Sequence, residues 1–262
     1  MKKIRLTNNS FEATFAPECG MNLLSFKRGD VEVIDQSTLP LFEERFAGLG
    51  ALIGPHFHHR EAFEIPTDFN QVAFPHIQRI KKHGTKEPFS HGIARYVPWE
   101  YEASSTQIKA KLKSSSEVAG IPLRKLEGFD FEMHLEATLM PWGLLFHYSV
   151  ESDKPSVIGF HTYYAIDGAP AEVIDDGKKP IPVEGSIDTN FHPQNPLIEN
   201  RILLNTKNYS LHLFYETASE ENSWQLFHPE GASYVCVEPL TAKNPRKPVH
   251  TSSQLEVRLE IY

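Results

Sequence analysis

The feature that most constrains the fold of this chain is a series of short segments in which apolar and polar residues alternate. Phe11–Phe15, Gln107–Leu112 and Leu255–Ile261 are examples, and clusters of Pro, Gly, Asn and Asp separate them. An alternation with period two is typical of strands that bury one face. Helical segments do not recur between the strands, so a parallel strand–helix–strand design is not indicated. The pattern predicts an all-β sandwich or barrel.

Local signals add detail to this prediction. Leu23–Phe26 and Val31–Ile34 flank the tetrad Lys-Arg-Gly-Asp, which indicates a hairpin. Helical periodicity is scarce; we expect a turn or two of helix within Leu41–Leu49 and within Ser114–Val118. Composition does not shift along the chain, and its 262 residues suit one large all-β unit, so we predict a single domain over residues 1–262.

Charge and cysteine content narrow the class of partner and the compartment. The formal net charge of −8 argues against a nucleic-acid or anionic-membrane surface. No run approaches the ~20 apolar residues of a spanning helix, and the basic start of the chain lacks the apolar run of a signal peptide. Cys19 and Cys236 are too few for a disulfide framework. A reduced, cytoplasmic protein that binds neither membrane nor nucleic acid is expected.

Three short motifs contain residues that handle protons. Val157–Tyr164, with the sequence VIGFHTYY, places His161 among aromatic side chains of the kind on which sugar rings stack. His91 precedes Gly92 in a loop. Glu238 lies between an apolar strand and a proline, where burial would raise its pKa toward the range of a useful base. Each residue also has a structural interpretation: a core histidine, a turn histidine and an exposed carboxylate at a strand edge.

Other motifs allow further chemistry. Gly54–Arg60, with the sequence GPHFHHR, invites a metal interpretation, because alternate histidines on a strand share a face. The carboxylate spacing of a cupin-like metal site is missing, so no metal is predicted. Asp188, in a polar loop, could accept hydrogen bonds from hydroxyl groups or cap a turn. There is no Gly-x-Ser-x-Gly elbow, P-loop or dinucleotide fingerprint, and no cofactor is expected.

Taken in order along the chain, these pieces resemble the aldose 1-epimerase (galactose mutarotase) family. The similarity begins at Phe15–Leu23 and ends near Asn244; its most specific points are His91-Gly92, the segment 159–163 and Glu238-Pro239. The resemblance implies a large antiparallel β-sandwich of the galactose mutarotase type. It also implies a site, in a cleft across one sheet, that interconverts the anomers of a hexose without a cofactor.

The resemblance also implies roles for individual residues. Glu238 matches the general base, His161 the general acid, and His91 a second histidine that holds the substrate. Arg60 and Asp188 match residues that bind sugar hydroxyls. We also expect Arg95, Trp99 and Tyr163 to contact the substrate, Arg95 through a phosphate and the two aromatics by stacking. The expected partner is a small sugar, an aldohexose or its phosphate, and the expected assembly is a monomer or homodimer.

Three alternatives remain open from sequence alone. The segments His-Gly-x-x-Arg and Val-Cys-Val-Glu-Pro also resemble the hexose-6-phosphate mutarotase branch, in which Arg60, Arg95 or the basic run 79–82 would meet a phosphate. A non-catalytic carbohydrate-binding protein would need the aromatic platforms but no paired acid and base. A metal-dependent enzyme of the cupin type would use His56 and His58, with His59 beside them.

Overall fold

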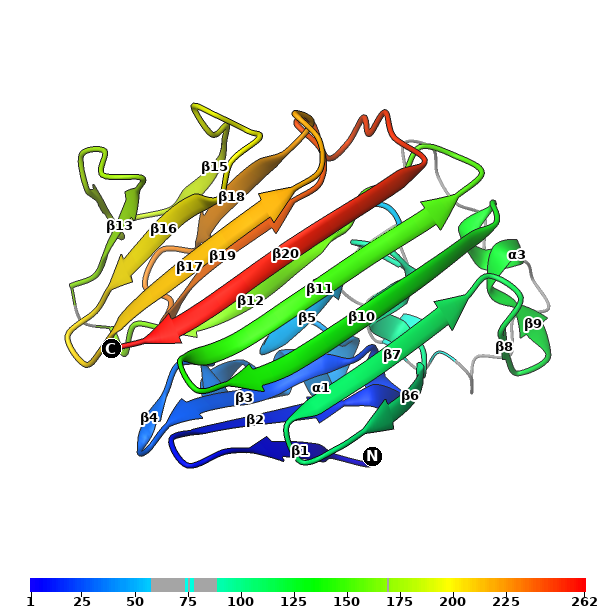
Figure 1. Ribbon diagram of the computed structural model, residues 1–262, viewed down its shortest axis with the longest axis horizontal. Helices are drawn as coiled ribbons and strands as arrows, with labels where there is room; N and C mark the ends of the chain where they lie inside the picture. Colours follow the sequence, from blue (N-terminus) through cyan, green and yellow to red (C-terminus); the bar gives the residue numbers. More distant parts are fainter. Residues whose placement is uncertain (58–73, 75, 78–88, 169) are drawn as a thin grey trace.

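Two large antiparallel sheets pack face to face in the computed structural model, which describes residues 1–57, 74, 76–77, 89–168 and 170–262. Each sheet has nine strands (Figure 1). The prediction of an all-β, antiparallel β-sandwich is therefore confirmed. None of the helices in the described residues has the length and apolar character required to cross a membrane.

The first sheet carries the order β1-β2-β3-β5-β12-β19-β18-β15, with β4 paired to β3. Its strands are β1 Ile4–Thr7, β2 Phe11–Ala16, β3 Asn22–Arg28, β4 Val31–Glu32, β5 Gly50–Ile53, β12 Gly159–Ala165, β15 Ile187–Phe191, β18 Ser223–His228 and β19 Tyr234–Leu240. The predicted hairpin is present, since β3 and β4 pair through Arg28 and Val31. Strands far apart in the sequence thus become neighbours at the centre of this sheet.

The second sheet, in front in Figure 1, carries the order β14-β13-β16-β17-β20-β11-β10-β7-β6. Its strands are β6 Glu100–Ala103, β7 Gln107–Lys113, β10 Phe131–Met140, β11 Gly143–Ser152, β13 Glu172–Asp175, β14 Ile181–Pro182, β16 Asn200–Asn205, β17 Ser210–Thr217 and β20 Ser252–Ile261. A separate pair is formed by β8 Glu117–Val118 and β9 Ile121–Pro122. The helices of the described residues are α1 Leu39–Arg45, α3 Leu123–Glu127 and the 3-10 turns Pro17–Cys19, Gln36–Thr38 and Ile93–Tyr96.

Alternating burial along the strands shows where the core lies. In β10 every second residue is buried, as expected for a strand with one face against a partner sheet. Phe146 of β11 contacts Phe15 of β2 and Phe160 of β12, so these rings fill the space between the sheets. Strand β12 differs, because all seven of its residues are buried. His161, next to Phe160, therefore points to the outer face of the first sheet, which is covered at this point.

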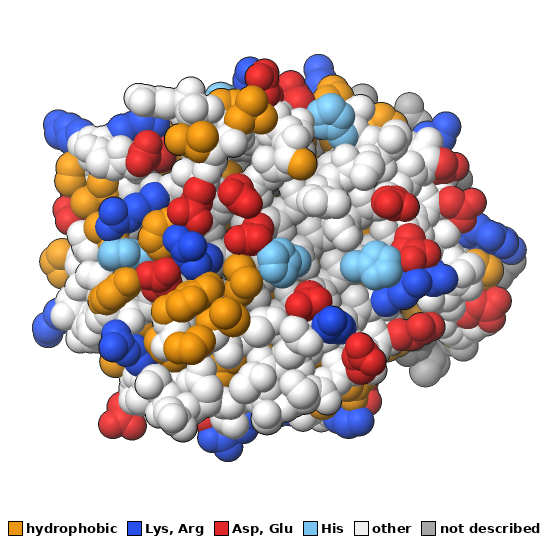
Figure 2. Space-filling view, viewed as in Figure 1, with side chains coloured by type: hydrophobic (Ala, Val, Ile, Leu, Met, Phe, Trp, Pro, Cys, Tyr) orange, Lys and Arg blue, Asp and Glu red, His pale blue; other side chains and the backbone are white. Residues whose placement is uncertain are grey.

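The outer face of the second sheet is more open. Figure 2 shows histidine and charged side chains gathered over it. A hollow of about 590 Å³ there is lined by His134, Glu136, His147 and Glu256 among others. His147 Nδ1 lies 3.2 Å from Glu256 Oε2, and these side chains are 52% and 35% exposed. The paired side chains of this hollow are therefore solvated.

Two local predictions need comment. A helix does begin near Leu41, as α1, and it ends at Arg45 before Phe46 in a left-handed conformation. The helical turn expected within Ser114–Val118 is wrong, because the segment forms a turn that leads into β8. Its last two residues, Glu117 and Val118, pair with Pro122 and Ile121 of β9, so the segment enters a short antiparallel ladder instead of a helix.

Candidate functional site

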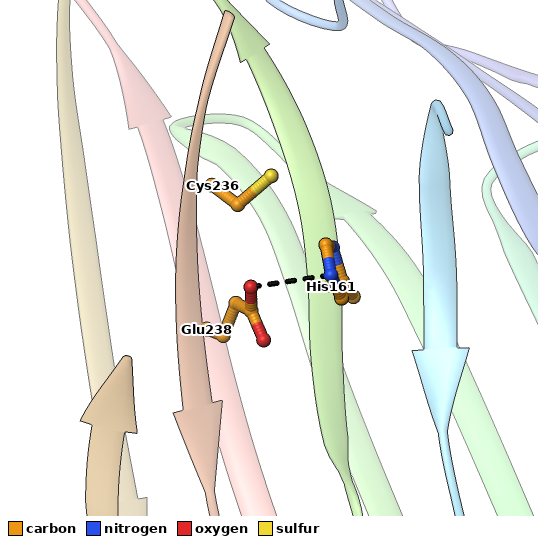
Figure 3. Close-up of side chains that lie close together, drawn as sticks. All are labelled: His161, Cys236 and Glu238. Carbon is orange, nitrogen blue, oxygen red and sulfur yellow. Dashed lines mark ion pairs between the residues drawn. The ribbon is translucent and has the colours of Figure 1, made fainter. Parts of the chain in front are cut away.

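The register between β12 and β19 brings the first two candidate residues together. Thr162 pairs with Val237, so the preceding residue, His161, lies opposite Glu238 on the neighbouring strand. Directly opposed residues share a face of the sheet and have adjacent side chains. His161 Nε2 lies 3.3 Å from Glu238 Oε1 (Figure 3). The two residues are 77 positions apart in the sequence, and the sheet places them in contact.

Gly159 makes this close approach of the strands feasible. A Cβ added there would lie 2.5 Å from the carbonyl oxygen of Pro239 and 2.7 Å from Leu240 Cδ2. Any larger residue would therefore press β12 away from β19, two residues from His161.

Glu238 is a buried carboxyl group. It is 1% exposed, and neither carboxylate oxygen has a hydrogen-bond partner among the described residues. Burial raises the pKa of Glu238 to about 8; the positive charge of Arg95 opposes that shift and the negative charge of Asp188 adds to it. A carboxyl group with a pKa near neutral can both accept and return a proton under ordinary conditions.

Its position in the chain differs from the sequence-based expectation in one respect. Glu238 and Pro239 were expected at the end of a strand, but β19 continues to Leu240. Glu238 therefore lies on an interior strand, which pairs with β12 on one side and β18 on the other. This interior position explains the strength of its desolvation.

His91 reaches the same place from a loop. Its ring centroid lies 5.1 Å from that of His161 and 4.5 Å from that of Phe57. The loop is tied to the end of β5, since His91 N donates to the Phe57 carbonyl over 2.9 Å and Gly54 N donates to the His91 carbonyl over 2.8 Å. At Gly92, φ is +89° and a Cβ would lie 1.9 Å from the Gly54 oxygen. Only glycine fits there, and it fixes His91 beside His161.

A pocket of about 520 Å³ opens over these residues. It is lined by Phe57, His91, His161, Asp188, Asn190, His192, Gln225, Phe227, Glu238, Lys243, Asn244, Pro245 and Arg246. This volume lies within the range of small-molecule sites, roughly 300–1,000 Å³. Glu238, His161, His91 and Asp188 thus share one pocket, as the sequence analysis predicted for a single site.

A row of polar side chains crosses the sheet beneath this pocket. Asn190 pairs with Gln225, which in turn pairs with Glu238. Gln225 Nε2 donates to Asp188 Oδ1 over 2.6 Å and so holds the aspartate at the pocket wall. Sequence reasoning did not find Gln225 or Asn190. Gln225 belongs to β18, which the alternation did not reveal, and neither residue stands in a recognisable motif.

Two of the remaining predicted contacts, Tyr163 and Arg95, do not line the pocket. Tyr163 stacks on His161, with ring centroids 4.9 Å apart, and is buried. Arg95 is buried too; its Nε donates to the Leu52 carbonyl over 3.0 Å, and its charge acts on Glu238. Both residues support the proton-handling pair without lining the pocket. Arg60, the basic run 79–82 and the histidines at 58 and 59 lie outside the described residues.

Trp99 requires a correction. It was predicted as a stacking platform for substrate, but its side chain is 3% exposed and it does not line the pocket. Its indole N–H donates to the Ala94 carbonyl over 2.9 Å, and its ring faces Tyr148. Trp99 is therefore a core residue, packed in the main cluster of buried residues.

Two groups of side chains bear on metal binding. His56, the first histidine of the cluster, contacts Glu127 of α3 through its Nδ1, and Glu127 Oε2 accepts a hydrogen bond from Ile93 N over 3.4 Å. A second group is formed by His161, Cys236 and Glu238, whose ligand atoms all lie within 4.8 Å of one another. Burial raises the pKa of the Cys236 thiol well above its usual range. Cys236 was not a candidate from sequence.

Solved structures with the same fold cover nearly the whole chain. A candidate aldose 1-epimerase from Escherichia coli K12 is 12% identical with a TM-score of 0.68, over 100% of this chain and 99% of that one. A galactose mutarotase-like protein from Lactobacillus casei is 14% identical with a TM-score of 0.64, over 100% of both chains. Another from Clostridium acetobutylicum is 15% identical with a TM-score of 0.66, over 99% and 94%.

These similarities identify the class of fold. The protein has the galactose mutarotase-like β-sandwich fold, and most of its structural neighbours are aldose 1-epimerase or galactose mutarotase-like proteins. No protein-family model and no curated protein sequence matches the chain. The likeness is therefore one of structure, and the resemblance inferred from the short motifs is confirmed at the level of the fold.

Proposed function

We propose that the protein is an aldose 1-epimerase, a mutarotase that interconverts the α and β anomers of a hexose. The observation that carries the proposal is the 3.3 Å separation of His161 Nε2 and Glu238 Oε1 in a pocket of sugar size. The hydroxyl that loses a proton and the ring oxygen that gains one are bonded to the same carbon of the sugar. An acid and a base that serve them must therefore lie next to each other.

The reaction needs only proton transfer and positioning. The Glu238 carboxylate takes the proton of the anomeric hydroxyl, while protonated His161 donates a proton to the ring oxygen. The bond between that oxygen and the anomeric carbon breaks and leaves the open-chain aldehyde. Rotation about the next carbon–carbon bond, followed by ring closure with the proton transfers reversed, gives the other anomer. The raised pKa of Glu238, about 8, suits a group that gives the proton back.

Neighbouring residues hold the substrate in this scheme. His91, beside His161, donates to a sugar oxygen near the reacting carbon. Asp188, fixed by Gln225, accepts hydrogen bonds from hydroxyl groups. Arg60 is assigned to the same task by its resemblance to the family pattern. Tyr163 and Arg95 do not contact the substrate in this scheme. Tyr163 stacks on His161, and the positive charge of Arg95 limits the rise in the pKa of Glu238.

The partner proposed is a small sugar, with a hexose 6-phosphate as the second candidate. Lys243 and Arg246 line the pocket and would favour a phosphorylated sugar. Both cysteines, Cys19 and Cys236, are free, which supports the proposal of a cytoplasmic protein. A monomer or homodimer would serve, because each residue proposed to act comes from one chain.

The test is anomer exchange measured by saturation-transfer NMR on a panel of free and 6-phosphorylated hexoses. We expect the wild-type protein to accelerate exchange for at least one sugar. Glu238→Gln and His161→Ala should each lower that acceleration by about 10²–10⁴-fold. Binding of a sugar with no acceleration of exchange would instead support a non-catalytic carbohydrate-binding protein.

The second sheet provides a matched control. His147 and Glu256 form a pair with a separation of 3.2 Å, close to that of the site, but on the outer face of the other sheet. His147→Ala and Glu256→Gln should leave the exchange rate within about twofold of wild type, since exposed pairs contribute little. Equal losses in both pairs would contradict the assignment.

A further inference from the structure

The proposed proton-transfer pair has a third neighbour that the proposed reaction does not use. Cys236 lies two residues before Glu238 on β19, so the two side chains share a face of the strand. The ligand atoms of Cys236, Glu238 and His161 lie within 4.8 Å of one another (Figure 3). A thiol has no part in hemiacetal opening, and its presence beside the acid and the base raises the question of another ligand.

The three donors are those that Zn²⁺ prefers. Zinc binds a thiolate sulfur at about 2.3 Å, and imidazole nitrogen and carboxylate oxygen at about 2.0–2.2 Å, in tetrahedral geometry. Two such nitrogen and oxygen ligands are about 3.4 Å apart around one ion. The His161 to Glu238 distance of 3.3 Å already fits that separation. The Cys236 sulfur, within 4.8 Å of both ligand atoms, would supply the third ligand.

The surroundings of the cluster favour a cation. Glu238 is 1% exposed, and no described residue donates a hydrogen bond to either of its oxygens. An isolated carboxylate in such a place is costly, and a bound cation offsets that cost. His161 and Glu238 also line the pocket, so the cluster has a route to solvent.

We infer that His161, Cys236 and Glu238 form a binding site for a thiophilic divalent cation such as Zn²⁺, and that the bound cation inhibits the enzyme. Binding occupies the nitrogen and the oxygen that would otherwise transfer protons, so the free acid–base pair and the metal complex exclude each other. The inhibition rests on the proposed function, whereas the binding does not. His56, which contacts Glu127, is not one of these three residues.

The binding is tested on metal-free wild-type protein titrated with Co²⁺, a spectroscopic substitute for zinc. We expect one equivalent to produce the near-ultraviolet absorption of a thiolate–cobalt bond together with visible bands of tetrahedral intensity. Cys236→Ser should abolish the thiolate absorption and weaken Zn²⁺ binding, measured by competition, at least tenfold. Glu256→Gln should change neither. Absence of the thiolate band in the wild-type protein, or its persistence in Cys236→Ser, would overturn the site.

The inhibition is tested by comparing each protein with itself. Zn²⁺ should lower the wild-type anomer-exchange rate more than tenfold, a chelator should restore it, and Cys236→Ser should need at least ten times more Zn²⁺ for the same fractional loss. Equal sensitivity in the two proteins would overturn the inference. If no sugar is exchanged but the cobalt spectrum appears, the proposed function fails and the metal site stands.

Discussion

Burial of the Glu238 carboxyl group has a cost that can be measured. Its pKa is raised from 4.5 to about 8, mainly by desolvation. The folded protein therefore holds this proton over a pH range in which the unfolded chain has lost it. Stability from this group is fully present below about 4.5 and is lost as pH rises toward about 8. A protein with no use for a base here would be more stable with a neutral residue.

Replacing the carboxyl group should therefore stabilise the fold while it removes activity. At pH 8 we expect Glu238→Gln to raise the free energy of unfolding by about 1–3 kcal/mol relative to wild type, with little difference near pH 4.5. Chemical denaturation at the two pH values measures this difference. A stability difference that is the same at both would contradict the assigned pKa.

The same titration should govern catalysis in the metal-free enzyme. Because the base must be ionised while the acid is protonated, kcat/KM for anomer exchange should follow a bell-shaped pH profile with one limb near pH 8. The His147→Ala variant should give the same profile. A rate constant independent of pH between about 6 and 9 would show that Glu238 is not the base.

At the scale of elements, the position of His91 depends on how its loop meets β5. Backbone hydrogen bonds join His91 to Phe57 and to Gly54. Glu127 of α3 holds both segments, since one oxygen contacts His56 and the other accepts from Ile93 N. The loop is thus fixed to the sheet by several independent contacts. The site should be largely preformed before substrate binds.

Gly92→Ala tests this connection. The new methyl group would collide with the Gly54 oxygen in a backbone conformation that alanine rarely adopts. We expect a loss of about 2–4 kcal/mol in unfolding free energy and a drop in exchange rate, because His91 is displaced. Gly231→Ala is the control, with φ of +74° and no atom within 4 Å of the added Cβ. Equal costs for the two variants would contradict the close packing at Gly92.

The elements also show what sequence reasoning could reach. Alternation located β2, β7 and β20, because strands with one buried face carry a period of two. It did not reveal β18, and it did not reveal α3, a short helix that gains its stability from tertiary packing. The pairing of His161 with Glu238 depends on a register between distant strands, which local patterns do not encode. The family resemblance supplied that pairing, and it did not supply Cys236, Gln225 or Asn190.

At the scale of the whole molecule, the two sheets differ in what covers their outer faces. The first sheet is covered around β12, so its polar residues there are desolvated. The histidine and charged side chains on the outer face of the second sheet are exposed, as Figure 2 shows. Desolvation raises the pKa of Glu238 in the first sheet, whereas a hydrogen bond from Lys111 lowers the pKa of the partly exposed Glu132 in the second sheet to about 2. A core cluster of buried residues draws on both sheets.

Ligand binding should distinguish the two faces. In a titration with the sugar that exchanges fastest, we expect the imidazole NMR signals of His91 and His161 to shift and those of His134 and His147 to stay in place. Substitution of each histidine in turn assigns the signals. A response confined to the histidines of the second sheet would move the sugar site to the other side of the molecule.

The central claim is that His161 and Glu238 act together on one substrate. A double-mutant cycle of the anomer-exchange rate tests it most directly. We expect His161→Ala and Glu238→Gln each to lose about 10²–10⁴-fold and the double variant to lose little more than the worse single one, as for residues that act as a unit. Losses that multiply in the double variant, or a single variant near the wild-type rate, would contradict the claim.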